Sequence, residues 1–325
     1  MKLHVTMAAL AAATALSVAP AAAQTRWNLP AAYPTDNPHT VNLMDFAKDV
    51  SELTGGKLQI TVHAAASLFK APEIKRAVQT GQAQMGEVLL SIHENEDPLY
   101  GLDIVPFLAT SYAQSRKLWA ATRPAIEKRL GAQGMMVLMA VPWGPQGIYA
   151  KKDINAIEDM RGLKWRSYNV GTARIAELVG AQSVTIQAAE LPQALATGVV
   201  NAFMTSASTG YDSKAWESMD HFYDTQAWIP KNLTIVNKAA FDGLDKPTQA
   251  AILKAAAVAE DRGWKLAEEK NAWFMDQLKD NKIKILPPSD ALKAGLLKIG
   301  DQLTADWTKK AGADGQAVIA AYRKL

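Results

Sequence analysis

A nine-residue pattern occurs twice in the chain and constrains its fold more than any other feature. Residues 73–81 read EIKRAVQTG and residues 190–198 read ELPQALATG. Each copy predicts a short helix that ends at glycine and precedes a strand, Glu87 to Ile92 in the first case and Val199 to Thr205 in the second. The repetition predicts two similar lobes whose strand ends meet at a shared crevice, where open α/β sheets bind ligands.

The N-terminal part of the chain alternates between strand and helix patterns. Arg26 to Tyr33 predicts a strand, and Thr40 to Leu53 predicts a helix. Lys57 to His63 then alternates like a half-buried strand, and Pro72 to Gln79 predicts another helix. This β-α-β-α order is typical of an α/β fold in which helices cover a mainly parallel sheet.

Two segments are expected to carry the chain between the lobes. Met135 to Val141 is continuously apolar, which indicates a buried strand, and it ends in the Pro/Gly-rich segment Pro142 to Gly147. Trp228 to Asn232 leads into a further strand, Leu233 to Asn237. Helical periodicity from Thr248 to Asp280 should reach roughly 50 Å, so this helix is expected to span both lobes. Lobes joined in this way can hinge and close on a ligand.

The expected parts of the chain are a signal peptide and two discontinuous domains. They are residues 1–23, residues 24–143 plus 232–271 (domain I), and residues 144–231 plus 272–325 (domain II). The first part has Lys2, an apolar run that is too short for a membrane span, and alanines before Gln24. This layout is typical of a secretory signal. We therefore expect cleavage after Ala23 and a periplasmic protein.

Composition excludes several classes of function. The chain of 325 residues has no cysteine, which rules out disulfides and thiol chemistry. Its formal net charge of +3 is spread over segments of mixed sign, so no nucleic-acid partner is expected. Neither a Gly-x-Ser-x-Gly motif nor a glycine-rich phosphate loop occurs. These absences favour a binding protein without a cofactor over an enzyme.

Gly162 to Asn169 is a strand-like segment that carries an arginine beside an aromatic residue. Alternation places Lys164, Arg166 and Tyr168 on one face. The guanidinium of Arg166 presents a rigid fork of donors that matches a carboxylate. Spacing alone leaves two interpretations open, a buried anion site and a structural or solvated arginine.

Three segments together resemble a known family. Residues 157–166 read IEDMRGLKWR, residues 190–201 read ELPQALATGVVN, and residues 85–87 read MGE. In these segments, and over nearly its full length, the chain resembles the periplasmic solute-binding proteins of tripartite ATP-independent periplasmic (TRAP) transporters, in the dicarboxylate-type group. The first segment matches the Gly-Leu-Lys-apolar-Arg pattern of that family, whose arginine pairs with the ligand carboxylate. The resemblance implies this role for Arg166.

The resemblance also implies an architecture and partners. It implies two α/β lobes around a central cleft, with a long helix along the back. It further implies closure around a small-molecule organic acid, which is handed to a small and a large TRAP membrane subunit.

Two departures from the family pattern bear on the ligand. Gln146 stands where many relatives carry a second arginine, so a second ligand carboxylate would be costly to desolvate. Met204 stands where a glutamate helps to hold a cation in some relatives, and a hard cation requires oxygen ligands. We therefore expect no metal, with Thr205 as a neutral hydrogen-bonding group.

Aromatic residues gather near the inferred cleft. They are Tyr33, Phe69, Trp143, Tyr168, Phe203 and Trp228, of which about half should touch the ligand. The expected ligand-binding residues are Arg166, Gln146, Tyr168, Thr205, Trp143, Trp228, Phe69 and Tyr33. Aromatic walls around one arginine favour an aromatic or bulky apolar monocarboxylate. The alternatives are a C4-dicarboxylate or sugar acid, with Lys164 or another basic residue replacing the missing arginine, and an exported sensor for such an acid.

Overall fold

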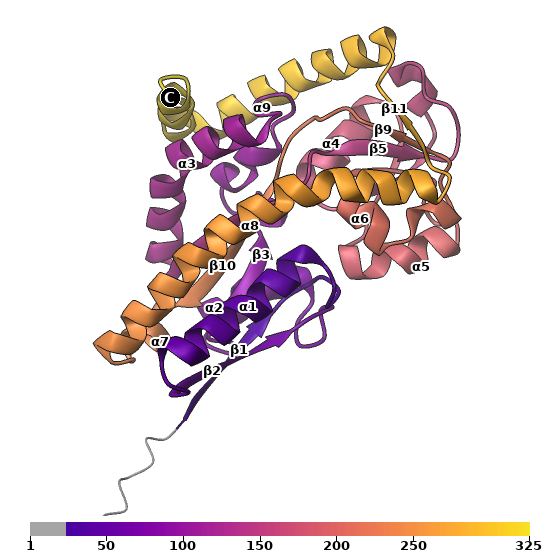
Figure 1. The fold of residues 1–325 in the computed structure, drawn as a ribbon. Coiled ribbons are helices and arrows are strands. Elements are labelled where there is room, and N and C mark those ends of the chain that lie inside the picture. The colour runs from indigo at the N-terminus through magenta and orange to yellow at the C-terminus, as the bar shows by residue number, and fades with distance from the viewer. Residues whose placement is uncertain (1–23) are drawn as a thin grey trace, which may run out of the picture.

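The computed structural model describes residues 24–325, so the expected signal peptide and its cleavage site lie outside the described residues. The chain forms two α/β lobes, as expected, with the long helix α8 (Lys246–Asp280) running along both (Figure 1). None of the helices in residues 24–325 has a stretch long and apolar enough to cross a membrane.

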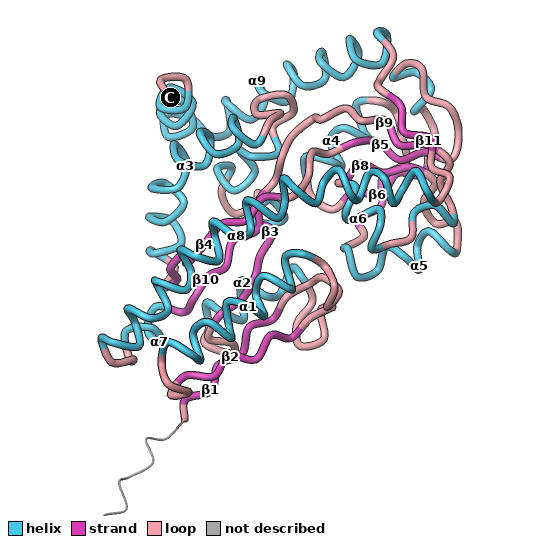
Figure 2. Tube along the Cα trace, in the orientation of Figure 1, coloured by secondary structure: helices cyan, strands magenta, loops and turns pink. Residues whose placement is uncertain are grey.

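The first lobe is built on two small sheets. The strands are β1 (Thr25–Pro30), β2 (Leu58–His63), β3 (Met85–Leu89), β4 (Met135–Pro142) and β10 (Lys231–Asn237). The helices are α1 (Pro38–Leu53), α2 (Ala71–Gln79), α3 (Tyr112–Ala132) and α7 (Lys238–Asp242). Strands β1 and β2 pair in parallel, and β10 lies between β3 and β4. Figure 2 shows the helices of this lobe around its strands.

The second lobe has one sheet of six strands in the order β11-β9-β5-β8-β6-β7. The strands are β5 (Gly147–Ala150), β6 (Lys164–Ser167), β7 (Gln182–Thr185), β8 (Ala202–Thr205), β9 (His221–Tyr223) and β11 (Lys284–Leu286). The helices are α4 (Val170–Leu178), α5 (Leu191–Ala196), α6 (Ala207–Asp212) and the start of α9 (Asp290–Tyr322). The candidate arginine strand β6 pairs in parallel with both β7 and β8.

Antiparallel pairs are as frequent as parallel ones, which corrects the expectation of mainly parallel pairing. Strand β10 is antiparallel to β3 and β4, and β5 is antiparallel to β8 and β9. Both strands enter their sheet directly after the chain crosses from the other lobe. A crossing strand is not preceded by the helix of a βαβ unit, so the right-handed crossover that produces parallel pairing is absent.

The repeated sequence pattern forms the same structure in both lobes. Helix α2 ends before Gly81 and precedes β3, and α5 ends before Gly198 and precedes β8. The two glycines have φ angles of 77° and 68°. L-residues with a side chain rarely adopt these values, so glycine at the helix end is what the turn requires.

Helix α8 matches its predicted extent closely and packs against the first lobe through a glycine. A Cβ atom on Gly263 would lie 2.6 Å from Cγ2 of Val141 and 2.9 Å from Nδ2 of Asn42. Helix α8 therefore packs closely on β4 and α1 at this position. Glycine lowers helix propensity, but here its lack of a side chain allows the contact.

The end of α9 packs on the first lobe, which differs from the expected boundary of 272–325 in domain II. Gly295 at the start of α9 lies against Ile157 of the second lobe. Beyond it, Trp307 and Val318 belong to the core of the first lobe, and the C-terminus lies beside α3 (Figure 1). A break in helical geometry at Gly312, with φ 58° and ψ −145°, lets the last turns change direction.

The two crossing segments pair with each other like a short ribbon. The Trp143 N–H donates to Pro230 O, and the Gln146 N–H donates to Trp228 O at 3.0 Å. In the opposite direction, the Ala227 N–H donates to Gln146 O at 3.0 Å. This ribbon, residues 143–146 with 227–230, joins the lobes and forms one side of the cavity described next.

Candidate ligand-binding site

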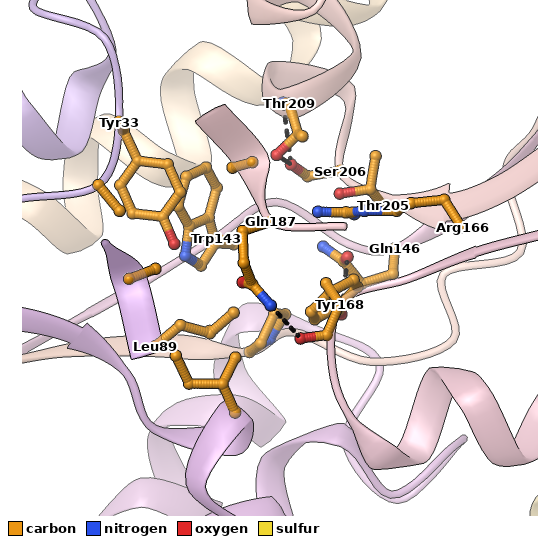
Figure 3. A pocket seen from close by; sticks show the side chains of 15 residues that line it. Tyr33, Leu89, Trp143, Gln146, Arg166, Tyr168, Gln187, Thr205, Ser206 and Thr209 are labelled. Carbon is orange, nitrogen blue, oxygen red and sulfur yellow. Dashed lines mark hydrogen bonds between the residues drawn. The ribbon is translucent and has the colours of Figure 1, made fainter. Parts of the chain in front are cut away.

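A cavity lies between the lobes at the ends of the strands, with an empty volume of about 470 Å³ including its opening to solvent. It is lined from the first lobe by Ala32, Tyr33, Ala71, Leu89 and Ile92, from the ribbon by Trp143, Gln146 and Pro230, and from the second lobe by Arg166, Tyr168, Gln187, Ala188, Thr205, Ser206 and Thr209. Figure 3 shows these side chains converging from both lobes.

Arg166 provides the positive charge of the cavity. Its side chain is 2% exposed, and its Nε–H donates to Ile186 O at 2.8 Å. Its guanidinium carbon lies 4.9 Å from the centre of the Tyr168 ring. Within residues 24–325 it forms no ion pair. Burial lowers the pKa of Arg166 to about 10, so the side chain remains protonated at neutral pH.

A buried cation without an acidic partner is rare, because desolvation of the charge must be offset. The cation–π contact and the bond to Ile186 O offset part of this cost. The guanidinium still has donors directed into the cavity (Figure 3). These donors match the oxygens of a ligand carboxylate.

Gln146 and Tyr168 form the wall beside Arg166. The Tyr168 hydroxyl donates to Gln146 Oε1 at 3.3 Å, and Gln146 Nε2–H donates to Gly144 O at 2.8 Å. Burial raises the pKa of Tyr168, while the hydrogen bond from Trp228 and the charge of Arg166 oppose this. Tyr168 therefore stays a neutral hydroxyl.

Small polar groups from the end of β8 and the start of α6 complete the second-lobe wall. Ser206 caps α6 by accepting from the Thr209 N–H at 3.2 Å, and its hydroxyl contacts the Thr209 hydroxyl at 3.1 Å. Thr205 lines the cavity, and its hydroxyl has no hydrogen-bond partner among the described residues. The hydroxyl of Thr205 is therefore available to a ligand.

The first-lobe wall is aromatic and apolar. The rings of Tyr33 and Trp143 meet edge to face with centroids 4.6 Å apart, and the His39 ring stacks on Trp143 at 4.1 Å. The Trp143 indole N–H donates to Asn232 Oδ1 at 2.8 Å, which fixes the ring. Burial, followed by the negative charge of Glu87, raises the pKa of Tyr33, so this wall carries a neutral phenol.

The structure brings six of the eight expected ligand-binding residues to the cavity lining. They are Tyr33, Trp143, Gln146, Arg166, Tyr168 and Thr205.

Trp228 is buried behind Tyr168 and donates to its hydroxyl at 3.3 Å, so it does not line the cavity. Phe69 packs against the first-lobe core outside the lining. Phe203 stacks on Tyr149 at 4.6 Å within the second lobe. Three of the six aromatic residues thus reach the cavity.

Sequence reasoning missed Gln187, Ser206 and Thr209, although one general signal could have found them. Gln187 follows β7 by two residues, and its Nε2–H donates to Tyr168 O at 3.4 Å. Ser206 follows β8 directly. Residues just beyond the carboxyl ends of strands line ligand crevices in α/β folds. Lys164, considered as a replacement for a second arginine, is exposed at the start of β6 and lies outside the lining.

Hydrogen bonds also join the two lobes directly. Asn37 Nδ2–H donates to Asp212 Oδ2 at 2.6 Å, and Asn169 Nδ2–H donates to Ser91 Oγ at 3.1 Å. In each pair one residue belongs to the first lobe and the other to the second. The lobes are therefore closed on each other.

In the part of the chain that the structure describes, no group of three or more His, Asp or Glu side chains could hold a metal ion.

The model of the bacterial extracellular solute-binding proteins, family 7, matches residues 31–310. The chain belongs to this family. Family 7 proteins are periplasmic solute-binding receptors of TRAP transporters, which confirms the resemblance and the expectation of a receptor rather than an enzyme.

Three relatives illustrate the range of family 7. An extracytoplasmic solute receptor of Bordetella pertussis that binds pyroglutamic acid is 58% identical, with a TM-score of 0.91 over 93% of this chain and 100% of that one. A TRAP solute-binding protein from a marine metagenome, specific for pyroglutamate, is 44% identical, with a TM-score of 0.92 over 93% and 99% of the chains. The C4-dicarboxylate-binding periplasmic protein of Rhodobacter capsulatus is 26% identical over 254 residues, 75% of this chain and 74% of that protein.

Proposed function

We propose that this receptor binds a small cyclic monocarboxylate of the pyroglutamate type through Arg166 and delivers it to the membrane subunits of a TRAP transporter. The observation that carries the proposal is the buried guanidinium of Arg166, which has no acidic partner in residues 24–325 and faces a cavity between closed lobes. A ligand carboxylate supplies the missing anion.

The charge of the lining favours one carboxylate over two. Arg166 is the cation of the cavity, and the other polar lining groups are amides and hydroxyls. A second carboxylate would lose its hydration without gaining a cation, at a cost of several kcal/mol. Gln146, in the place of a second arginine, supports a monocarboxylate.

The remaining groups favour a ring with its own amide. Gln146, Gln187 and Thr205 offer neutral donors and acceptors, while Tyr33 and Trp143 offer an apolar face. A lactam ring meets both requirements because it has a flat apolar edge, an N–H and a carbonyl oxygen. A plain aryl acid would satisfy the aromatic wall and leave the amides unpaired. The Bordetella and metagenome relatives, which bind pyroglutamate, add support.

Isothermal titration with a panel of acids tests the ligand class. L-pyroglutamate should bind at least about tenfold more tightly than phenylpyruvate or benzoate. Its advantage over succinate or malate should be larger than that. Mass spectrometry of acid released from protein purified without refolding gives an independent answer. Preference for an aryl acid would restore the aromatic hypothesis, and preference for succinate would reject the monocarboxylate proposal.

Delivery to a transporter requires a separate test. Proteoliposomes that carry the small and large TRAP subunits should accumulate labelled L-pyroglutamate only when this receptor is added. Binding without stimulated uptake would favour the alternative of an exported sensor.

A further inference from the structure

Trp228 lies one layer behind the cavity and is connected to it by hydrogen bonds. Its side chain is 1% exposed and packs in the core of the second lobe. Its indole N–H donates to the Tyr168 hydroxyl at 3.3 Å. From there the bonds continue to Gln146 Oε1 at 3.3 Å and from Gln146 Nε2 to Gly144 O at 2.8 Å. The four groups form one buried chain, which we name the Trp228 relay.

The direction of every bond in the Trp228 relay is set by the chemistry of its two ends. An indole N–H can only donate, and a backbone carbonyl can only accept. The atom of Gln146 that faces Gly144 O must therefore be the amide nitrogen, and its other atom is the oxygen. That oxygen must accept from Tyr168, so the Tyr168 hydroxyl donates to Gln146 and accepts from Trp228.

This direction decides what Gln146 presents to a ligand. Its oxygen accepts from Tyr168, and one N–H is used by Gly144 O. The second N–H remains, on a side chain that lies beside the guanidinium of Arg166 in Figure 3. Gln146 thus offers a donor next to Arg166, which suits an anionic or carbonyl oxygen.

The Trp228 relay also positions Arg166. The Tyr168 ring lies 4.9 Å from the guanidinium carbon, and the hydroxyl at the far end of that ring is held by Trp228 and Gln146. The two hydrogen bonds at its hydroxyl restrict the movement of the Tyr168 ring. The ring in turn restricts where the guanidinium of Arg166 can lie. The positions of both Arg166 and Gln146 therefore depend on Tyr168.

We propose that Trp228 is a positioning residue for ligand recognition, which acts through Tyr168 to orient Gln146 and Arg166 without touching the ligand. The inference rests on the proposed function, because it takes this cavity as the ligand site. Trp228 and Gln146 both belong to the ribbon between the lobes. The proposal therefore gives the ribbon a role in ligand recognition in addition to joining the lobes. All members of the relay lie in the ribbon or second lobe, so its hydrogen bonds involve no side chain of the first lobe.

Substitutions that remove one hydrogen bond at a time test the proposal. Trp228→Phe removes the indole N–H and keeps an aromatic ring in the core, and Tyr168→Phe keeps the ring under Arg166. Trp228→Phe should weaken L-pyroglutamate binding about 5- to 20-fold. In the Tyr168→Phe background the same change should have almost no further effect, because the relay is already broken.

Trp264→Phe is the matched control. Trp264 is 2% exposed and its indole N–H donates to Ala140 O at 2.9 Å in the first lobe. This control loses a buried hydrogen bond of the same kind and should bind L-pyroglutamate like the parent. Equal weakening by Trp228→Phe and Trp264→Phe would reduce Trp228 to a general structural role. An undiminished effect of Trp228→Phe in the Tyr168→Phe background would show that it does not act through Tyr168.

A measurement without ligand keeps the relay testable if the proposed function fails. The side-chain amide resonances of Gln146 can be assigned by their loss in Gln146→Ala. Trp228→Phe and Tyr168→Phe should both shift these resonances, and Trp264→Phe should leave them in place. Unshifted resonances would overturn the relay. If the parent fails to bind L-pyroglutamate while the resonances shift as expected, the ligand assignment is wrong and the relay stands.

Discussion

Asn37 of the first lobe donates a hydrogen bond of 2.6 Å to the carboxylate of Asp212 in the second lobe. Asn37 is buried and also caps helix α1 by accepting from the His39 N–H. Asp212 ends helix α6, which begins at the cavity. The contact therefore connects the start of a first-lobe helix to the element that carries Ser206 and Thr209, and it bridges the two lobes.

The stability of the closed protein should depend on pH through Asp212. Burial, followed by the charge of Asp36, raises the pKa of Asp212 to about 7, against the effect of the bond from Asn37. The folded protein thus binds this proton more tightly than the unfolded chain, in which the carboxyl has its ordinary pKa. The proton on Asp212 therefore contributes to the free energy of unfolding. This contribution is complete below about pH 4 and is lost as the pH rises to about 7.

Asp212→Asn should remove this dependence because the amide has no proton to lose. At pH 8 the variant should exceed the parent in free energy of unfolding by on the order of 2 kcal/mol, and at pH 5 the two should differ less. Denaturant titrations at both pH values measure the difference. An offset that is the same at pH 5 and pH 8 would contradict the prediction.

Arg166→Ala should nearly abolish binding of the ligand. Loss of one side of a buried charge pair costs about 2–5 kcal/mol, which corresponds to roughly 30- to 5,000-fold in affinity. Arg166→Lys should retain part of the affinity, because a point charge replaces the planar fork. Isothermal titration with L-pyroglutamate measures both variants. Parent-like binding by Arg166→Ala would place the anion site elsewhere.

Gln146→Glu should also abolish binding, although it changes few atoms. The new carboxylate would lie beside Arg166, where Gln146 lies in Figure 3, and would pair with it in place of the ligand. It would also leave no side-chain N–H to face a ligand oxygen. We expect at least a 100-fold loss of L-pyroglutamate affinity by titration, with a cooperative melting transition retained as evidence of folding. Unchanged affinity would mean that Gln146 lies away from the carboxylate.

Gly263→Ala and Gly131→Ala should have opposite effects on stability. Both glycines lie within helices, where alanine is favoured by about 0.5–1 kcal/mol. At Gly263 the new methyl group would meet Val141 at 2.6 Å, and overpacking of this kind costs about 1–3 kcal/mol. At exposed Gly131 nothing lies within 4 Å. Chemical denaturation should show destabilisation at Gly263 and stabilisation at Gly131; stabilisation at both sites would refute the tight contact.

Local patterns in the sequence were enough for the features that depend on neighbouring residues. Strand alternation placed Arg166 and Tyr168 on one face, and the repeated segment ending at Gly81 and Gly198 indicated two similar lobes. Helical periodicity located α8 to within two residues at its start. These features follow from the fixed periods of helices and strands and from the turn conformations that glycine permits.

Long-range packing decided the rest. It put Trp228 behind Tyr168 rather than in the cavity, left Phe69 outside the lining, and joined Asn37 to Asp212 across the lobes. It also carried the end of α9 back to the first lobe. A residue's spacing along the chain specifies which face of its own element it occupies, but not which element lies against that face. That second choice depends on shape and charge distributed over the whole molecule, and here it determined which aromatic residues form the site and which one supports it.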